Sequence, residues 1–241
     1  LTAISVICIA SLIGLLDDIS ILGRKEKAWF ISTASLPIII SQVGPVEIDF
    51  LIYYLDFSSY PLVFWCFLVP LGVTSCANAL NMSAGYNGLE SGQMVIMSFC
   101  LLIISYLDGS PSSILLLYSS ILGSCIALFL FNKYPASVFI GDIGTLGFGS
   151  LLAVTIIMSG HLVYGVICII PTFFELFSTI KYSFKGVERR GACMNPDISS
   201  IGIIKPPKGS EDYTLAFMLL SRNNLTEKKL VYVILGLYLF F

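Results

Sequence analysis

The chain carries little charge for its length. Only 12% of its 241 residues are Asp, Glu, Lys or Arg, whereas 56% are hydrophobic. A soluble domain carries about 25% charged residues, so this composition excludes an ordinary soluble globular protein and indicates a membrane protein. The net charge of −2 says little about partners by itself, and we expect no nucleic acid among them.

Histidine is nearly absent, and the cysteines lack the spacing of a metal site. The one histidine is His161. Six of the seven cysteines lie in apolar runs, where cysteine acts as a small hydrophobe, and only Cys193 is in a polar loop. Without CxxC or Cys/His pairs, neither a zinc site nor a disulfide framework is supported. No Walker loop, dinucleotide fingerprint or Ser/His/Asp arrangement is evident either.

The start of the chain lacks the features of a signal peptide. It begins at Leu1 inside an apolar run, with no basic segment before it and no small-residue cleavage site after it. We therefore expect that the natural N-terminus precedes Leu1.

Long hydrophobic runs are abundant. They predict an all-α, polytopic transmembrane bundle of about eight segments, each roughly long enough to cross about 30 Å of hydrocarbon. The approximate ranges are 2–16, 28–43, 62–81, 94–107, 114–131, 146–159, 161–183 and 228–241. We expect one integral-membrane domain over 1–241, with a large loop at 184–227 in which 213–222 forms a short amphipathic helix.

The basic residues fall on one side of this topology. If the segments alternate in direction, all 13 lysines and arginines lie in loops or at helix ends on the same side. The other side carries Glu47, Asp49, Asp56, Asp108 and His161. The positive-inside rule makes the basic side cytoplasmic, and the position of His161 argues against histidine catalysis.

Acids and a lysine lie at segment ends on the basic side. Asp17 and Asp18 suit metal binding or removal of a proton from a phosphate, or they are solvated helix-end residues. Lys27, on a short basic loop, could meet phosphate or only mark the cytoplasmic side. Asp142, in the stretch GDIG, could ligate a divalent cation or cap a helix.

The stretch NALNMSAGYNGLESGQ, residues 78–93, concentrates amides, glycines and an acid at the mouth of a membrane segment. Asn78 and Asn81 are three residues apart and share a helix face. Asparagine can ligate magnesium or bind a nucleotide base. The alternative is an ordinary turn with interfacial amides. The polar or turn-forming positions are Asn78, Asn81, Gly85, Asn87, Gly88 and Glu90.

Two further features have both a functional and a structural interpretation. Arg189 and Arg190 suit a diphosphate, because guanidinium groups match its oxygens, but they also form part of the positive-inside signal. Glu175 lies inside the segment 161–183, where acids are costly and often functional. It could instead pair with Lys181.

The motifs LLDDISILGRKEK, NALNMSAGYNGLESGQ, VFIGDIGTLGFGS and VERRGACMNPD, in this order, resemble those of the polyprenyl-phosphate N-acetylhexosamine-1-phosphate transferases. The form AG-x-NGLE-x-GQ looks most like the eukaryotic and archaeal branch, which uses UDP-N-acetylglucosamine and dolichyl phosphate. The bacterial translocase usually shows TDG-x-DG and a histidine-rich motif, and this sequence has neither.

The resemblance implies a fold of about ten helices, so that two segments would precede Leu1, and it implies Mg²⁺, or Mn²⁺, as cofactor. By alignment the catalytic residues would be Asp17 and Asp18, and the metal ligands Asn81 and Asp142. The substrate-binding residues would be Lys27, Asn78, Asn87, Gly88, Glu90, Arg189 and Arg190. Of these, Lys27 would contact phosphate and Asn87 uridine. The arginine run here reads Glu-Arg-Arg, where eukaryotic members carry Arg-His-Arg.

The expected function is transfer of N-acetylglucosamine 1-phosphate from UDP to dolichyl phosphate, with release of UMP. One alternative is a bacterial-type transferase that uses undecaprenyl phosphate, and another is an ion-coupled transporter. The expected partners are the two substrates and the bilayer, and a homodimer is compatible with the sequence. The site would face the cytoplasm, in the endoplasmic reticulum of a eukaryote or the plasma membrane of an archaeon.

Overall fold

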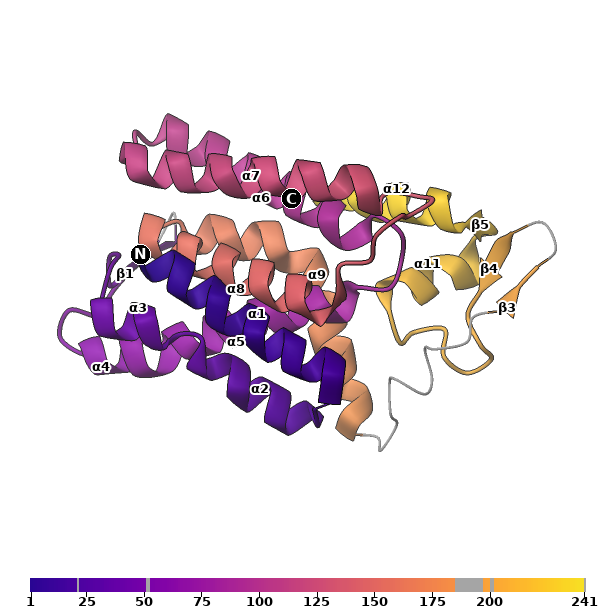
Figure 1. Cartoon of the computed structure of the whole chain (residues 1–241), viewed down its shortest axis with the longest axis horizontal. Coiled ribbons are helices and arrows are strands. Elements are labelled where there is room, and N and C mark those ends of the chain that lie inside the picture. Colours follow the sequence, from indigo (N-terminus) through magenta and orange to yellow (C-terminus); the bar gives the residue numbers. More distant parts are fainter. Residues whose placement is uncertain (21, 51–52, 185–196, 200–201, 241) are drawn as a thin grey trace.

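The computed structural model describes residues 1–241 except 21, 51–52, 185–196, 200–201 and 241. Roughly parallel and antiparallel helices form a bundle, with small sheets at its two ends (Figure 1). Among the described residues, six helices are long and apolar enough to cross a membrane. They confirm the polytopic all-α class, with fewer full-length spans than the eight segments expected.

Five of these spans are continuous helices: α1 (Thr2–Ser20), α6 (Leu89–Leu107), α7 (Ser112–Asn132), α8 (Gly141–Ser159) and α9 (Leu162–Phe184). The sixth joins α4 (Pro61–Val63), the π-helical turn η1 (Phe64–Leu68) and α5 (Val69–Ser83). Pro70 lies at the start of α5. Proline has no N–H to donate to a carbonyl of the preceding turn. The missing hydrogen bond is a local cause for the wider π turn before Pro70.

The segment expected at 28–43 is two helices, α2 (Arg24–Thr33) and α3 (Leu36–Ser41). The break is local: the N–H of Ala34 bonds to the carbonyl of Ile31, and the Ser35 hydroxyl bonds to that of Ser32. Pro37 then supplies no N–H to continue the ladder. The two short helices replace the single predicted span.

The segment expected at 228–241 is α12, which extends over the 12 residues Glu227–Tyr238. At a rise of about 1.5 Å per residue it is about 18 Å long, shorter than the hydrocarbon layer. Lys228 and Lys229 are exposed in its first turn, so only its later part is apolar.

Helix α8 lies at the centre of the bundle and packs chiefly against α1 and α5. Two glycines permit the close approach. A Cβ on Gly14 of α1 would fall on the backbone of Asp142, and one on Gly149 of α8 would come within 2.7 Å of the Ala77 Cα. The start of α8 is therefore held directly against α1.

Two small sheets were not expected from the sequence. The hairpin β1 (Glu47–Phe50) and β2 (Tyr53–Asp56) lies at one end of the bundle (Figure 1). At the other end, β3 (Asp197–Ile198), β4 (Ile203–Lys205) and β5 (Leu225–Thr226) pair beside α11 (Leu215–Arg222). Helix α11 confirms the short helix predicted at 213–222.

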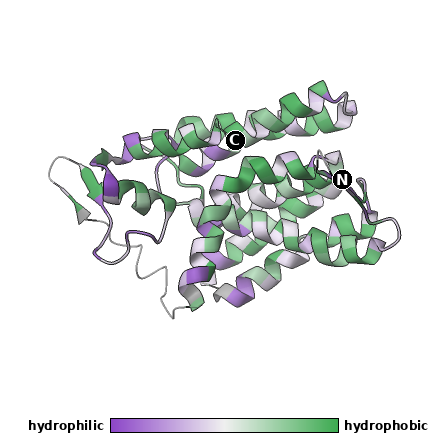
Figure 2. Cartoon of the chain, turned by 180° about the vertical axis from the view of Figure 1, so that it is seen from behind, coloured by the Kyte–Doolittle hydropathy of each residue, from purple (hydrophilic) through white to green (hydrophobic). Residues whose placement is uncertain are grey.

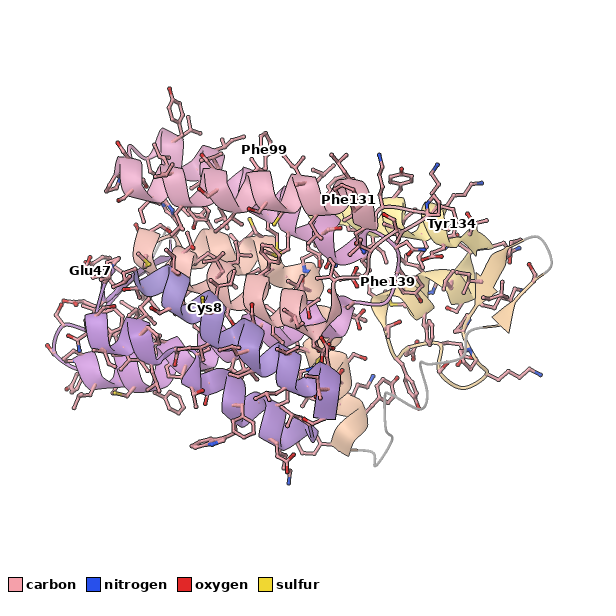
Figure 3. All side chains as sticks on the ribbon, viewed as in Figure 1. Cys8, Glu47, Phe99, Phe131, Tyr134 and Phe139 are labelled. Atoms are coloured by element: carbon pink, nitrogen blue, oxygen red, sulfur yellow. The ribbon has the colours of Figure 1, made fainter. Side chains whose placement is uncertain are left out.

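The outer surface of the bundle is apolar. Figure 2 shows hydrophobic residues along the helices, and hydrophilic ones gathered mainly at the end that holds α11. Phe99 of α6 and Phe131 of α7 are exposed and point away from the bundle (Figure 3). Exposed aromatic side chains on membrane-length helices are expected where the surface contacts lipid.

Candidate active site

The ends of four helices bring Asp17, Lys27, Asn81 and Asp142 together. Asp17 is near the end of α1, Lys27 in the first turn of α2, Asn81 near the end of α5 and Asp142 at the start of α8. They are separated by up to 125 residues in the sequence. Alternating helix directions place all four at the same end of the bundle.

The ammonium of Lys27 is the centre of this cluster. Its Nζ lies 2.6 Å from Asp17 Oδ2 and 3.0 Å from Asn81 Oδ1, and it also donates to Asp142 Oδ2. The side chains of Lys27 and Asp17 are only 14% and 7% exposed. These are charge-assisted contacts in a partly desolvated place, where they are stronger than at a surface.

Further hydrogen bonds fix the orientation of the cluster. The Asn81 amide donates to Asp142 Oδ1 over 2.7 Å and to the Thr145 hydroxyl over 2.8 Å. The N–H of Leu22 donates to Asp17 Oδ1 over 2.6 Å. Both oxygens of Asp17 are thus engaged, and the carboxylate is held toward Lys27.

Asp18 points to a different partner from Asp17. Its two oxygens accept the N–H groups of Asp142 and Ile143 over 3.2 and 3.3 Å, at the N-terminus of α8. A Cβ on Gly141, whose φ is +65°, would lie 3.0 Å from Asp18 Oδ2. Asp18 therefore caps α8, and the glycine before Asp142 leaves room for that cap.

A cavity of about 550 Å³ opens beside the cluster. Helices α5, α6, α9, α11 and α12 contribute its remaining wall. The predicted site residues that line it are Asp17, Lys27, Asn78, Asn81 and Asp142. Asp18, Asn87, Gly88 and Glu90 do not line it.

The turn between α5 and α6 is held by carboxylate and amide acceptors. Glu90 Oε1 accepts the N–H of Gly85 over 2.9 Å, and Glu227 Oε1 of α12 accepts that of Asn87 over 2.8 Å. Asn132 Oδ1 of α7 accepts that of Gly88 over 3.1 Å. Gly88, with φ at +85° and a buried backbone, serves the turn.

Two of the predicted site residues bond within or beside their own helix. Asn78, buried, donates to the Thr74 carbonyl over 2.8 Å while lining the cavity. Glu90 is buried and holds the turn before α6. Arg189 and Arg190 lie outside the described residues.

A hydrogen-bonded chain in the cavity wall was not predicted from the sequence. Ser83 of α5 donates to Gln93 Oε1 of α6 over 2.8 Å, and Gln93 Nε2 donates to the Tyr238 hydroxyl of α12 over 3.0 Å. Tyr238 also bonds to Thr172 of α9. Gln93 lies at the polar end of residues 78–93, so the sequence could have suggested it as a site residue. The residues around Tyr238 are apolar and gave no such signal.

Glu175 has a structural partner that the sequence did not indicate. Buried in α9, it lines the cavity and accepts the N–H of Leu215, the first residue of α11, over 2.8 Å. Thr214 caps the same helix by accepting the N–H of Phe217 over 2.9 Å. Glu175 thereby helps to position α11 against the cavity.

A Ser/His/Asp arrangement, which the sequence did not reveal, lies at the opposite end of the bundle. His161 Nε2 lies 3.0 Å from Asp108 Oδ2, and its Nδ1 lies 3.2 Å from the Ser105 hydroxyl. Sequence separation hid this contact, because the ends of α6 and α9 meet only in the fold. Ser105 is fully buried, so the arrangement joins two helices and does not present a nucleophile.

The oxygens around Lys27 match the donor chemistry of a divalent metal. Asp17 Oδ2, Asn81 Oδ1 and Asp142 Oδ2 converge on one cation. Carboxylate and amide oxygens are the ligands that Mg²⁺ prefers, and Mn²⁺ accepts them too. Asn81 and Asp142 are the two residues that the resemblance assigns to the metal, and the donor set fits that assignment.

Comparisons with known proteins agree with the motifs. The model of glycosyl transferase family 4 matches residues 1–160. A Methanocaldococcus jannaschii protein named as a glycosyltransferase is 34% identical over 183 residues, which are 75% of this chain and 55% of that protein. A Sulfolobus acidocaldarius protein named as a UDP-N-acetylglucosamine–dolichyl-phosphate N-acetylglucosaminephosphotransferase is 35% identical over 74% of this chain and 54% of its own length.

A bacterial relative is also similar. A Streptococcus pyogenes protein named as a phospho-N-acetylmuramoyl-pentapeptide-transferase is 30% identical over 80% of this chain and 62% of its own length. The chain thus spans between 54% and 62% of the length of these three relatives. With about two thirds of its residues matched by the family model, the chain belongs to glycosyl transferase family 4.

Proposed function

We propose that the protein transfers N-acetylglucosamine 1-phosphate from UDP-N-acetylglucosamine to a polyprenyl phosphate, dolichyl phosphate in particular, and releases UMP. The product is the first intermediate in the assembly of lipid-linked oligosaccharides for N-glycosylation. The observation that carries this proposal is the convergence of Lys27, Asp17, Asn81 and Asp142 beside a cavity at the helix ends. The name of the Sulfolobus acidocaldarius relative agrees with it.

The reaction brings together two anionic substrates, so positive charge must offset their repulsion. Lys27 supplies a cation at the cavity wall. Bound Mg²⁺, held by Asn81 and Asp142, would add positive charge at the donor diphosphate. The lipid phosphate stays in the headgroup plane, which fits a site where membrane helices end.

In this mechanism an oxygen of the lipid phosphate attacks the β-phosphorus of the donor in line with the bridging oxygen. The new O–P bond forms as the bond between the β-phosphorus and the bridging oxygen breaks, and UMP leaves. Asp17 would remove or position any proton that remains on the lipid phosphate. Asp18 acts through the start of α8, where it holds Asp142.

The decisive test is Mg²⁺-dependent release of UMP from UDP-N-acetylglucosamine by the purified protein with dolichyl phosphate. Asp17→Asn and Asp142→Asn should each abolish transfer, since both carboxylates contact Lys27. Asp108→Asn makes the same change at the opposite end of the bundle and should retain activity. Near-normal turnover of either site variant would remove its assigned role.

A bacterial-type transferase is the second candidate, because the Streptococcus pyogenes relative covers 80% of the chain. An assay that compares UDP-sugars with dolichyl and undecaprenyl acceptors separates the two. An ion-coupled transporter would release no UMP. Membership in a transferase family and the position of Asp17, Asp18 and Asp142 at helix ends on one side of the bundle both argue against it.

A further inference from the structure

The cation at the centre of the site belongs to the protein itself. An ammonium has three N–H donors, and Lys27 directs hydrogen bonds to three oxygens, those of Asp17, Asn81 and Asp142. This is a full set of partners for a single ammonium. The same oxygens are the donors suited to a divalent metal.

Charge balance explains why Lys27 occupies this position. Two carboxylates face each other across the site, and Asp17 is almost completely buried. Burying unpaired charge is costly, so the Lys27 ammonium stabilises the pair. One negative charge in excess remains among Asp17, Asp142 and Lys27. This excess favours the binding of a cation of higher charge.

A metal ion and the ammonium compete for these oxygens. Two cations within a few ångströms repel each other strongly in a place of low dielectric. A bound metal would have to contact the oxygens that Lys27 now contacts, because Asp142 Oδ2 and Asn81 Oδ1 both point to Nζ. The two cations are therefore alternatives.

We propose that Lys27 and the divalent metal are alternative occupants of one three-oxygen site, so that Lys27 lowers metal affinity and metal binding releases its ammonium into the cavity. This inference rests on the proposed function, which places the metal at Asn81 and Asp142. Lys27 is the competitor that offsets one of the two carboxylate charges until the metal arrives.

The exchange couples metal binding to donor binding. Asp17, Asp142 and Lys27 together carry one negative charge, and a divalent metal makes the three-oxygen site itself neutral, so that the released Lys27 leaves the cavity wall with one positive charge in excess. A diphosphate then meets both cations at the cavity wall. The metal should bind more tightly when a nucleoside diphosphate is present, and the diphosphate more tightly when the metal is present, because such coupling is reciprocal.

The test measures Mn²⁺ binding to the purified protein by electron paramagnetic resonance, with and without UDP. Lys27→Met should bind Mn²⁺ alone about tenfold more tightly than the wild type, with a smaller increase when UDP is added. Lys25→Met removes the same charge from an exposed position on the same helix. It should change the affinity by no more than about twofold.

The outcomes separate this inference from the proposed function. Equal or weaker Mn²⁺ binding by Lys27→Met, alongside clear binding by the wild type, overturns the exchange and leaves the transferase proposal intact. If Asp142→Asn binds Mn²⁺ as well as the wild type does, the metal assignment itself is wrong.

A second measurement uses the wild-type chain and does not depend on the folding of a variant. Lys27 should react faster with an acylating reagent, followed by mass spectrometry, when Mn²⁺ saturates the site, because its 14%-exposed side chain is released. The labelling of Lys25 should stay constant. Unchanged labelling of Lys27 at saturating Mn²⁺ would contradict the exchange.

Discussion

At the scale of single residues, the neighbours Asp17 and Asp18 have separate partners. Adjacent helical positions point about 100° apart, which turns Asp17 to the Lys27 ammonium and Asp18 to the N-terminus of α8. Asp17 is buried in the cavity wall while Asp18 is exposed. We therefore expect the two carboxylates to have different roles in the proposed reaction.

Substitutions at Asp18 should distinguish a capping role from a chemical one. Asp18→Asn keeps an oxygen acceptor for the start of α8 and should retain activity within about tenfold of the wild type, whereas Asp18→Ala loses the cap, worth about 0.5–2 kcal/mol. Initial rates of UMP release and melting temperatures in detergent measure both effects. If Asp18→Asn is as inactive as Asp17→Asn although its melting temperature is normal, Asp18 has a direct chemical role.

The sequence predicted the residues of the cluster better than the residues that support it. Asp17, Lys27, Asn81 and Asp142 belong to recognisable motifs, and the fold brings all four together. Asn132 and Glu227 support the turn at Asn87 and Gly88, but each lies more than 40 residues away in the sequence. Such contacts depend on which helix ends meet, and local patterns do not contain that information.

At the scale of elements, α8 positions the site because it lies between α1 and α5. Gly14 of α1 sits against the backbone of Asp142. This contact fixes the distance between the α1 residue Asp17 and the α8 residue Asp142. The central packing of the bundle and the geometry of the polar cluster thus depend on the same contact.

A single methyl group added at Gly14 should disturb both the central packing of the bundle and the geometry of the polar cluster. Gly14→Ala places its Cβ on backbone atoms that cannot move away without shifting a helix, at a cost of about 1–3 kcal/mol. We expect a lower melting temperature and a loss of UMP release. Gly123→Ala, on α7, is the matched control: its Cβ meets nothing within 4 Å, so it should be neutral or slightly stabilising through helix propensity.

If Gly14→Ala behaves like Gly123→Ala in both measurements, the contact between α1 and α8 is not a constraint on the site. Retained stability with lost activity would instead localise its effect to the cluster.

Hydropathy predicted the long helices. It failed where local hydrogen bonds, proline or a strand-like alternation of residues determine the secondary structure. The span expected at 28–43 is interrupted at Ala34 and Ser35 by local hydrogen bonds before Pro37. The mean hydropathy of the apolar run does not reveal this interruption. The hairpin strand Glu47–Phe50 alternates acidic and apolar residues, a period-two pattern that a search for continuous hydrophobic runs misses.

At the scale of the whole molecule, the polar cluster shares one end of the bundle with basic residues of the described loops and helix ends. Lys27 lies in the first turn of α2 at this end, and Lys205, Lys208 and Arg222 lie around β4 and α11. The hairpin β1–β2 carries Glu47, Asp49 and Asp56 at the other end (Figure 1). Since cytoplasmic loops carry the excess of Lys and Arg, we propose that the cavity opens toward the cytoplasm, where nucleotide sugars are expected to be available.

Cysteine labelling measures this orientation. In a Cys193→Ser background, Ser59→Cys and Lys208→Cys each place a thiol at an exposed position, one beside the hairpin and one between β4 and α11. In sealed vesicles with the cytoplasmic face inward, a membrane-impermeant maleimide should label Ser59→Cys at once and Lys208→Cys only after permeabilisation. The Cys193→Ser protein alone gives the background from cysteines in the apolar segments. Labelling of Lys208→Cys in sealed vesicles would reverse the orientation, and the donor would then have to reach the cavity from the opposite side of the membrane.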